Sequence, residues 1–417
     1  MPSSKHCDIT HRLLIRGSCP WCRVALPDQK GKDFKGQQWS IPAISTALED
    51  KGKEVRITVV FLFLKGHIPE LVVVLPLLQR ALCDADRDVR DLAAVALASR
   101  GSAISETESK VIESRLLNTP NESALHILLL AYYFHRRNKL PSAEKDRCRH
   151  LLWIIENVPE LKIIGRPEAS LPHFEPGETY EQAKTIWLKN LERNPANVGI
   201  LENAASFFFQ FPAFVESLLH RARALDPDNP KWLQKLAQFH SRKAIHLTGT
   251  ARMEEARKSL SLLEGSLALS SNGPQRILMM VELSRAAFDA EEFEKAYHYA
   301  SKALNNASVA ERSWFSDNAF HHCNLVLGRL GLKAGDCTLA KTYLLESARI
   351  SGSPQLNSFG PNMTLAKELL LAGECEAVIQ YINLCRNFWM MGVHQLDTWF
   401  WDIKQGKVPE FGPNLHY

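Results

Sequence analysis

IPAISTALEDKGKEVRITVV, residues 41–60, matches LPLLQRALCDADRDVRDLAA, residues 75–94, at an offset of 34 residues. The identical pairs are Pro42 and Pro76, Ala47 and Ala81, Leu48 and Leu82, Asp50 and Asp84, Val55 and Val89, and Arg56 and Arg90. Self-similarity at a fixed offset is typical of repeat architectures, so the two stretches are interpreted as copies of one structural unit.

Each copy has the pattern of two helices joined by a tight turn. The apolar stripes that a helical period predicts are Leu75, Leu78 and Leu82 on the first helix, and Val89, Ala93, Ala96 and Leu97 on the second. Asp84 and Asp86 suit the turn and the start of the second helix, where a carboxylate favours the positive end of the helix dipole. A helix pair with one apolar face per helix must stack on further copies to be buried.

The pattern resembles HEAT-type repeats over about residues 37–160, which implies a domain at residues 37–163. A degenerate third copy is expected around Leu116 and residues 124–134, and residues 147–158 are expected to form one more helix that closes the stack. Residues 164–179 hold prolines and glycines without a helical stripe, so this segment is predicted to be a linker.

Residues 180–417 have a different repeating signature. Pro195 and Pro227 occupy matched places in LERNPANV (191–198) and ARALDPDNPKW (222–232), and each is expected to end a helix. Residues 277–304, 324–348 and 363–385 resemble tetratricopeptide repeats. In this resemblance Gly328, Ala296 and Ala340 are small because a neighbouring helix passes close to them.

The spacing of these copies exceeds the period of the family. Ala256, Ala296, Ala340 and Val378 are 40, 44 and 38 residues apart, so longer connecting loops are expected. After the last copy come the aromatic segment FWMMGVHQLDTWFWDIKQG (388–406) and the tetrapeptide FGPN, which occurs at residues 359–362 and again at 411–414. A cap on the final repeat is the favoured interpretation of this end, with a binding platform as the alternative.

Composition is that of a globular protein, with 45% hydrophobic and 23% charged residues, which argues against general disorder and against a fibrous repeat. The net charge of +4 is confined to residues 1–36, where seven basic residues face three acidic ones. The remaining chain is electrically balanced, so no broad footprint for nucleic acid is expected.

A cytoplasmic protein without a membrane span is expected. The polar opening residues do not resemble an export signal. The most apolar stretch, residues 57–78, is interrupted by Lys65, His67, Pro69 and Glu70, whereas a membrane-spanning helix needs about 20 apolar residues. The cysteine count of nine is odd and the cysteines are widely spread, which favours reduced thiols.

GSCPWC, residues 17–22, carries the clearest candidate for chemistry. The Cys-Pro-aromatic-Cys order resembles a glutaredoxin, but Pro27, Gly31 and Gly36 leave no room for the long helix that this fold needs next. With the upstream residues, the segment instead resembles a degenerate zinc ribbon. The resemblance implies a small basic module at residues 1–36, with structural zinc as cofactor.

Zinc in such a module takes four ligands. The family's second cysteine would stand at Thr10, so the neighbouring His11 is the expected substitute, with His6 as its competitor. The predicted ligand set is Cys7, His11, Cys19 and Cys22. A degenerate module that holds no metal is the alternative.

No catalytic residue is expected. The chain lacks a phosphate loop, a helical zinc-protease motif and a nucleophile elbow. FHHCN (320–324) places consecutive residues about 100° apart on a helix, so they cannot converge on one ion. The acidic pairs at residues 254–255 and 291–292 are expected at helix starts, where they compensate the dipole.

The sequence therefore predicts an all-α, two-part α-solenoid of stacked helical hairpins with a zinc-ribbon-like module in front. The expected function is a non-catalytic scaffold that binds a peptide or partner protein on the concave face. A nucleic-acid-associated or transcription-linked regulator that uses the basic module is the alternative. An enzyme whose catalytic residues follow no linear motif is the third hypothesis.

Overall fold

The computed structural model describes residues 41–64, 70–171, 177–270, 274–309 and 314–415, and all regular secondary structure in these ranges is helical. The chain divides into two units, residues 1–225 and residues 226–417. Within the described ranges, no helix combines the length and the apolar character that crossing a membrane requires.

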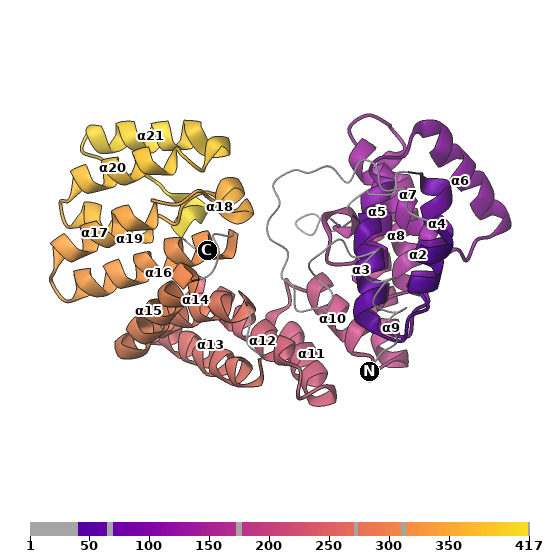
Figure 1. Cartoon of the computed structure of the whole chain (residues 1–417), viewed down its shortest axis with the longest axis horizontal. Helices are drawn as coiled ribbons and strands as arrows, with labels where there is room; N and C mark the ends of the chain where they lie inside the picture. The colour runs from indigo at the N-terminus through magenta and orange to yellow at the C-terminus, as the bar shows by residue number, and fades with distance from the viewer. Residues whose placement is uncertain (1–40, 65–69, 172–176, 271–273, 310–313, 416–417) are drawn as a thin grey trace. The chain divides into compact units, whose positions relative to one another are not determined.

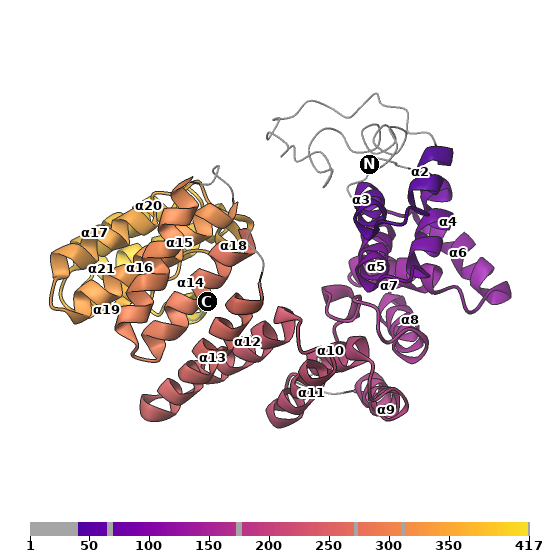
Figure 2. The same cartoon turned by 60° about the horizontal axis from the view of Figure 1, so that its bottom comes forward.

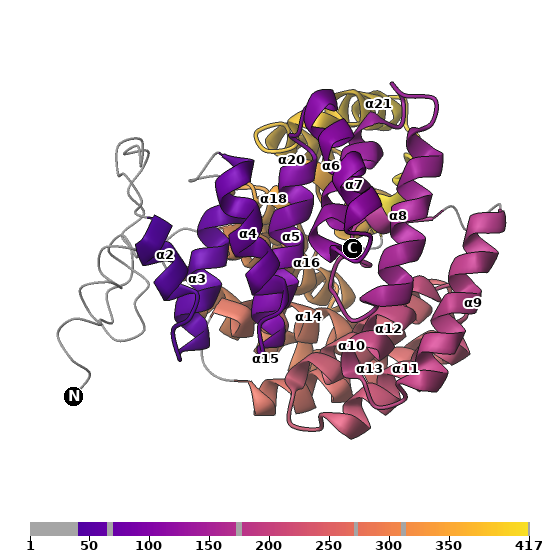
Figure 3. The same ribbon diagram turned by 90° about the vertical axis from the view of Figure 1, so that its right-hand side faces the viewer.

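The first unit stacks its helices in chain order. Their bounds are α2 Ile41–Ala47, α3 Lys53–Leu64, α4 Leu71–Leu82, α5 Arg87–Gly101, α6 Glu106–Asn118, α7 Ser123–Arg136, α8 Ala143–Asn157, α9 Glu178–Arg193, α10 Val198–Phe207 and α11 Pro212–Leu225. Helices α3, α5 and α7 pack side by side, with α4 against α5 and α6 against α7. Figure 3 shows helices α2 to α8 following one another across the view. This part of the chain is an α-solenoid.

Equivalent hydrogen bonds confirm the 34-residue offset. The Arg56 Nη1 atom donates to the Asp50 carbonyl at 2.7 Å, and Arg90 Nη1 donates to the Asp84 carbonyl at the same distance. The Asp50 and Asp84 carboxylates each accept from the backbone N–H two residues later. Arg56 also reaches forward to Asp84 of the next copy, with Nε–Oδ2 at 2.7 Å and Nη2–Oδ1 at 2.9 Å. The two copies are therefore joined by a bidentate ion pair.

The predicted apolar stripes of the second copy are buried. Leu75, Leu78 and Leu82 of α4 face the core, as do Val89, Ala93, Ala96 and Leu97 of α5. Asp86 is the N-cap of α5 and accepts from the backbone N–H groups of Asp88 and Val89. The helix–turn–helix prediction is thus confirmed at the residues that carried it.

The first unit continues beyond residue 163, where the sequence placed the end of the first repeat domain. Helix α9 packs against α8, so α8 does not close the stack. The Asn190 side chain of α9 donates to the Ile155 carbonyl at 2.7 Å, and Asn203 of α10 donates to the Pro159 carbonyl at 2.8 Å. The change of composition at residues 164–179 marks a connection, whereas the packing continues as far as residue 225.

The second unit begins with long helices and ends with short ones. Their bounds are α12 Pro230–Ile245, α13 Gly249–Leu269, α14 Pro274–Asp289, α15 Phe293–Val309, α16 Trp314–Lys333, α17 Cys337–Ser347, α18 Pro354–Phe359, α19 Thr364–Leu371, α20 Cys375–Cys385 and α21 Val393–Lys404. The 3-10 turns η2 (Met390–Gly392) and η3 (Gly412–Leu415) flank α21. Consecutive helices from α12 to α17 lie side by side, and α19, α20 and α21 complete the stack (Figures 1 and 2).

Small residues lie at helix crossings of the second unit, as predicted. Ala296 and Ala340 are completely buried. A Cβ atom on Gly328 of α16 would meet the Leu365 side chain of α19 and approach the Ala340 carbonyl oxygen of α17 to 3.3 Å. A larger side chain at these places would separate the helices.

The prediction of longer connecting loops is wrong for the first part of this unit and confirmed between α17 and α19. Helix α13 has 21 residues and α16 has 20, whereas an average helix has about 11–12. Between Ala256 and Ala340 the extra residues therefore lengthen helices, whereas between Ala340 and Val378 they form residues 348–363, a long connection that contains α18. The spacing between matched positions cannot distinguish longer loops from longer helices, because either change adds the same number of residues.

Candidate functional site

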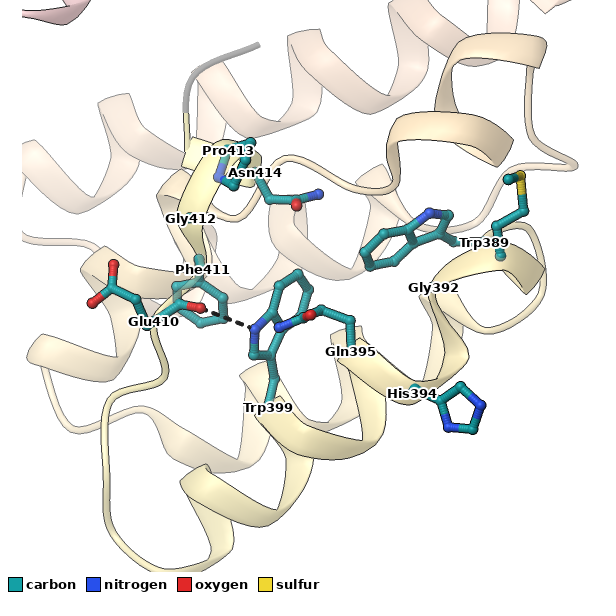
Figure 4. Close-up of a pocket in the computed structure, with 11 residues that line it drawn as sticks. Trp389, Gly392, His394, Gln395, Trp399, Glu410, Phe411, Gly412, Pro413 and Asn414 are labelled. Carbon is teal, nitrogen blue, oxygen red and sulfur yellow. Dashed lines mark hydrogen bonds between the residues drawn. The ribbon is translucent and has the colours of Figure 1, made fainter. Parts of the chain in front are cut away.

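A pocket opens at the C-terminal end of the second unit (Figure 4). Its volume is about 370 Å³. The lining residues come from η2, the first half of α21 and the C-terminal tail: Trp389, Met391, Gly392, His394, Gln395, Trp399, Glu410, Phe411, Gly412, Pro413 and Asn414. The size lies at the lower end of the range for small-ligand sites, which suits one or two side chains of a partner.

The two FGPN tetrapeptides hold the tail in place. Asn414 of the second tetrapeptide donates through Nδ2 to the Phe359 and Pro361 carbonyls of the first, at 3.0 and 2.9 Å. The Asn414 carbonyl accepts from the Met363 backbone N–H at 2.8 Å. The sequence shows the repetition but indicates only turns. The pairing makes residues 411–414 a wall of the pocket.

Trp389 forms a second wall because two glycines leave room for its ring. A Cβ atom on either Gly360 or Gly392 would overlap the same indole atoms of Trp389. Gly360 also has a φ of 89°, which side chains rarely adopt. The indole Nε1 donates to the Ser358 carbonyl at 3.4 Å.

Trp399 forms the floor between the walls. Its indole Nε1 donates to the Glu410 carbonyl at 3.2 Å, and its ring meets Phe411 edge-on with centroids 5.1 Å apart. Trp399 and Phe411 are almost fully buried. These aromatic rings belong to the apolar core of the last helices, the place that a cap would occupy.

Apolar side chains around the pocket remain exposed to solvent. The exposed fractions are 64% for Phe359, 72% for Met390 and 79% for Met391. These three residues lie on α18 and η2, which contact each other, and Met391 also lines the pocket. We call them the terminal apolar surface.

The pocket lining combines apolar side chains with the polar residues His394, Gln395, Glu410 and Asn414. In Figure 4 the Glu410 carboxylate extends away from Trp399, while the Glu410 carbonyl accepts the hydrogen bond from the indole nitrogen of Trp399. The lining set contains no serine, cysteine, lysine or aspartate. Since Trp399 and Phe411 are almost fully buried, a bound side chain would contact the exposed part of the lining, which includes Met391.

Truncating Asn414 should loosen this end of the chain. In Asn414→Ala, the Phe359 and Pro361 carbonyls lose a buried donor, and we expect the free energy of unfolding of the second unit to fall by about 2 kcal/mol. Urea denaturation measures this change. Asn383→Ala, at an exposed position of α20, is the control and should change it by less than about 0.5 kcal/mol. Equal effects of the two changes would contradict a stabilising role of the Asn414 hydrogen bonds.

The predicted zinc ligands Cys7, His11, Cys19 and Cys22 lie outside the described residues, so the zinc site stays a prediction. Elsewhere, the described ranges hold no group of three or more His, Cys, Asp or Glu side chains arranged to bind a metal. The six cysteines in these ranges are free thiols: Cys83, Cys148, Cys323, Cys337, Cys375 and Cys385.

His321 in FHHCN has a structural place, as expected. Its Nδ1–H donates to the Ser347 carbonyl at 3.0 Å, and its Nε2 accepts from the Asn362 backbone N–H at 3.0 Å. One neutral tautomer satisfies both contacts. Burial lowers the pKa of His321 to about 4, so the ring is neutral at neutral pH.

The prediction that Glu255 lies at the start of a helix is wrong. Helix α13 begins at Gly249, so Glu255 lies well inside it, buried against α12. The His240 Nδ1 atom lies 2.7 Å from Glu255 Oε2, and Lys243 and Lys258 donate to Oε1 at 3.0 and 2.9 Å. Burial by itself would raise the pKa of this carboxyl, but these hydrogen bonds outweigh it and lower the pKa to about 2. Local patterns do not specify the register between α12 and α13, so this cluster could not be predicted.

The fold and the pocket together define an α-solenoid with a pocket at its C-terminal end. No protein-family model matches the chain, and no curated protein matches it.

Proposed function

We propose that the protein is a non-catalytic scaffold that binds a peptide or a partner protein. The expectation from HEAT-type and tetratricopeptide-like repeats is a partner lying along the concave face of stacked hairpins. The observation that carries the proposal is the pocket beside the terminal apolar surface, since large exposed apolar side chains gathered at one place are typical of interaction sites. In this proposal the pocket holds an apolar side chain of the partner.

Peptide selection tests the function while the partner is unidentified. We expect a random-peptide display library, selected on the full chain, to yield peptides that share an apolar or aromatic residue. Met391→Glu should weaken their binding at least tenfold, which corresponds to about 1.4 kcal/mol, because a carboxylate at the rim disfavours an apolar ligand. Fluorescence polarisation with labelled peptides measures the affinity.

Val72→Glu is the matched control. Val72 of α4 is exposed and apolar like Met391 but lies in the first unit, so this change should leave the affinity unaltered. Peptides whose binding survives Met391→Glu would exclude the pocket as their site. A selection that enriches no peptide would contradict the scaffold function itself.

We propose further that Cys7, His11, Cys19 and Cys22 bind one structural zinc ion in the basic N-terminal module. Metal analysis of the purified chain should find about one zinc per chain. Cys19→Ser should lose the metal, whereas Cys83→Ser, at an exposed free cysteine, should retain it. A chain purified without chelators that contains no zinc would support the metal-free alternative.

We propose a cytoplasmic location for the protein. The absence of disulfides among the described cysteines supports it. The proposed partner is a protein, with neither a membrane nor nucleic acid favoured. Salt-sensitive retention on DNA or RNA that disappears when residues 1–36 are deleted would favour the nucleic-acid alternative instead.

A further inference from the structure

Two histidines face each other in the core of the first unit. His126 of α7 and His150 of α8 are buried, and their Nδ1 atoms lie 3.0 Å apart. The outer ring nitrogens make contacts as well. His126 Nε2 lies 3.0 Å from the Pro120 carbonyl oxygen, and His150 Nε2 lies 3.1 Å from Glu113 Oε1. The result is a chain of three polar contacts that runs from Pro120 to Glu113.

This chain needs more protons than two neutral rings supply. Each contact requires one proton between its two atoms, so three hydrogen bonds need three protons. A neutral imidazole carries one ring proton, and the His126–His150 pair therefore carries two. With both rings neutral and Glu113 ionised, one of the three contacts brings two lone pairs together.

Glu113 determines the tautomer of His150. Its carboxylate also accepts from the Tyr133 hydroxyl and from Arg149 Nη2, each at 2.8 Å. Burial alone would raise the pKa of this carboxyl, but hydrogen bonds from His150 and Tyr133, helped by the positive charge of Arg149, lower the pKa to about 2. An ionised Glu113 accepts from His150 Nε2–H, which leaves His150 Nδ1 as an acceptor. The single ring proton of neutral His126 then has two acceptors, His150 Nδ1 and the Pro120 carbonyl. When His126 Nδ1 holds this proton, Nε2 faces the Pro120 carbonyl without one.

We propose that His126 Nε2 and the Pro120 carbonyl form a proton-operated latch on the α6–α7 connection, which closes when the His126–His150 pair takes up a third ring proton. In the closed latch Nε2–H donates to the carbonyl, and the observed 3.0 Å contact is a hydrogen bond. In the open latch the two lone pairs repel, and the connection moves away from α7.

The α6–α7 connection is also held by hydrogen bonds of Glu122, so opening the latch frees only part of it. Glu122 accepts from Gln79 of α4 and from Arg115 of α6, both at 2.7 Å. The residues between α6 and α7 are therefore held by α4 and α6 on one side and by His126 on the other. Opening the latch releases only the second hold.

Charges around the pair set the pH at which the latch closes. Burial lowers the pKa of His126 to about 4, and the Pro120 carbonyl and the Glu113 carboxylate oppose this shift. Arg149 of α8 disfavours the extra proton on either ring, whereas Asp146 of the same helix favours it on His150. An unfolded histidine binds its proton near pH 6.5, so the stabilising contribution of neutral His126 is complete above that pH and is lost as pH falls towards 4.

Histidine-selective and backbone ¹⁵N NMR on the full chain tests the latch. At about pH 7.5, above the ordinary histidine pKa, we expect His126 to be the Nδ1–H tautomer with Nε2 unprotonated. On acidification Nε2 should gain its proton, and the amide signals of Asn121 and Glu122 should shift with the same midpoint. An Nε2–H tautomer of His126 at about pH 7.5 would overturn the proposal, and this result needs no variant.

Two glutamine variants complete the experiment. In His126→Gln the side-chain amide donates to the Pro120 carbonyl at every pH, so the shift at Asn121 and Glu122 should be lost. His321→Gln is the matched control, because His321 is also buried but has both ring nitrogens satisfied in the neutral state. It should retain the shift. Persistence of the same midpoint in His126→Gln would overturn the latch.

Discussion

Replacing Arg56 by alanine should lower the free energy of unfolding of the first unit by about 3 kcal/mol, because the change strands the Asp84 carboxylate in a nearly buried position. The side chains of Arg56 and Asp84 are only 13% and 10% exposed. Arg56 also holds the Asp50 carbonyl, so its removal loosens the turn within one copy and the link to the next. Hydrogen exchange of the α3 and α5 amides in the full chain measures the loss.

An exposed ion pair across the same two turns provides the control. Lys53 pairs with Asp88 at 3.1 Å, but the two side chains are 45% and 68% exposed. Solvent screens such a pair, so Lys53→Ala should change the free energy of unfolding by less than about 1 kcal/mol. If Lys53→Ala proved as destabilising as Arg56→Ala, the buried Arg56–Asp84 ion pair would have no special role in joining the two copies.

The second large effect is expected at Gly101, the last residue of α5. A Cβ atom there would overlap the Leu128 carbonyl of α7 and approach Ala131 Cβ to 3.0 Å. Backbone atoms cannot rotate away as a flexible side chain can, so Gly101→Ala must separate α5 from α7. We expect a loss of about 3 kcal/mol in the free energy of unfolding, measured by urea denaturation.

The same substitution at Gly265 should act in the opposite direction. Gly265 lies inside α13, where a Cβ atom would make only an ordinary contact with the Leu233 side chain at 3.4 Å. Alanine restricts the unfolded chain and favours the helix, so Gly265→Ala should stabilise by about 0.5–1 kcal/mol. A stabilising Gly101→Ala would show that α5 and α7 do not make the close approach at Leu128.

The regularities of the chain could be predicted because they are local. The match between residues 41–60 and 75–94 indicated the helix pairs, and the stripe of Leu75, Leu78 and Leu82 indicated which face is buried. Pro195 and Pro227 were predicted to end helices, and α9 and α11 end just before them. Such signals depend on residues a few positions apart, whose relative placement on a helix is fixed.

Two sequence features, the repeated FGPN and the aromatic segment, pointed to the candidate site but did not predict its contacts. The repeated FGPN was visible, but a repeated turn motif does not reveal that Asn414 binds the backbone of the first copy. The aromatic segment predicted a cap, and Trp399 and Phe411 occupy the place of one, while Met391 and Trp401 of the same segment remain exposed. Within α21, helical periodicity places Trp399 on the buried stripe with Leu396 and Ile403. Met391 in η2 and Phe411 in the tail lie outside this helix, so periodicity does not apply to them.

The sequence by itself determined an all-α chain of stacked hairpins, since apolar periodicity and small residues at crossings are properties of each helix pair. Only the tertiary structure decided the buried pairing of Glu255 with His240, the contact between His126 and His150, and the hydrogen bond from Asn414 to the Pro361 carbonyl that completes the pocket. These contacts join residues from different helices or from distant segments, and their formation depends on helix length, register and rotation. A single sequence does not specify those quantities, because many registers bury the same apolar faces equally well.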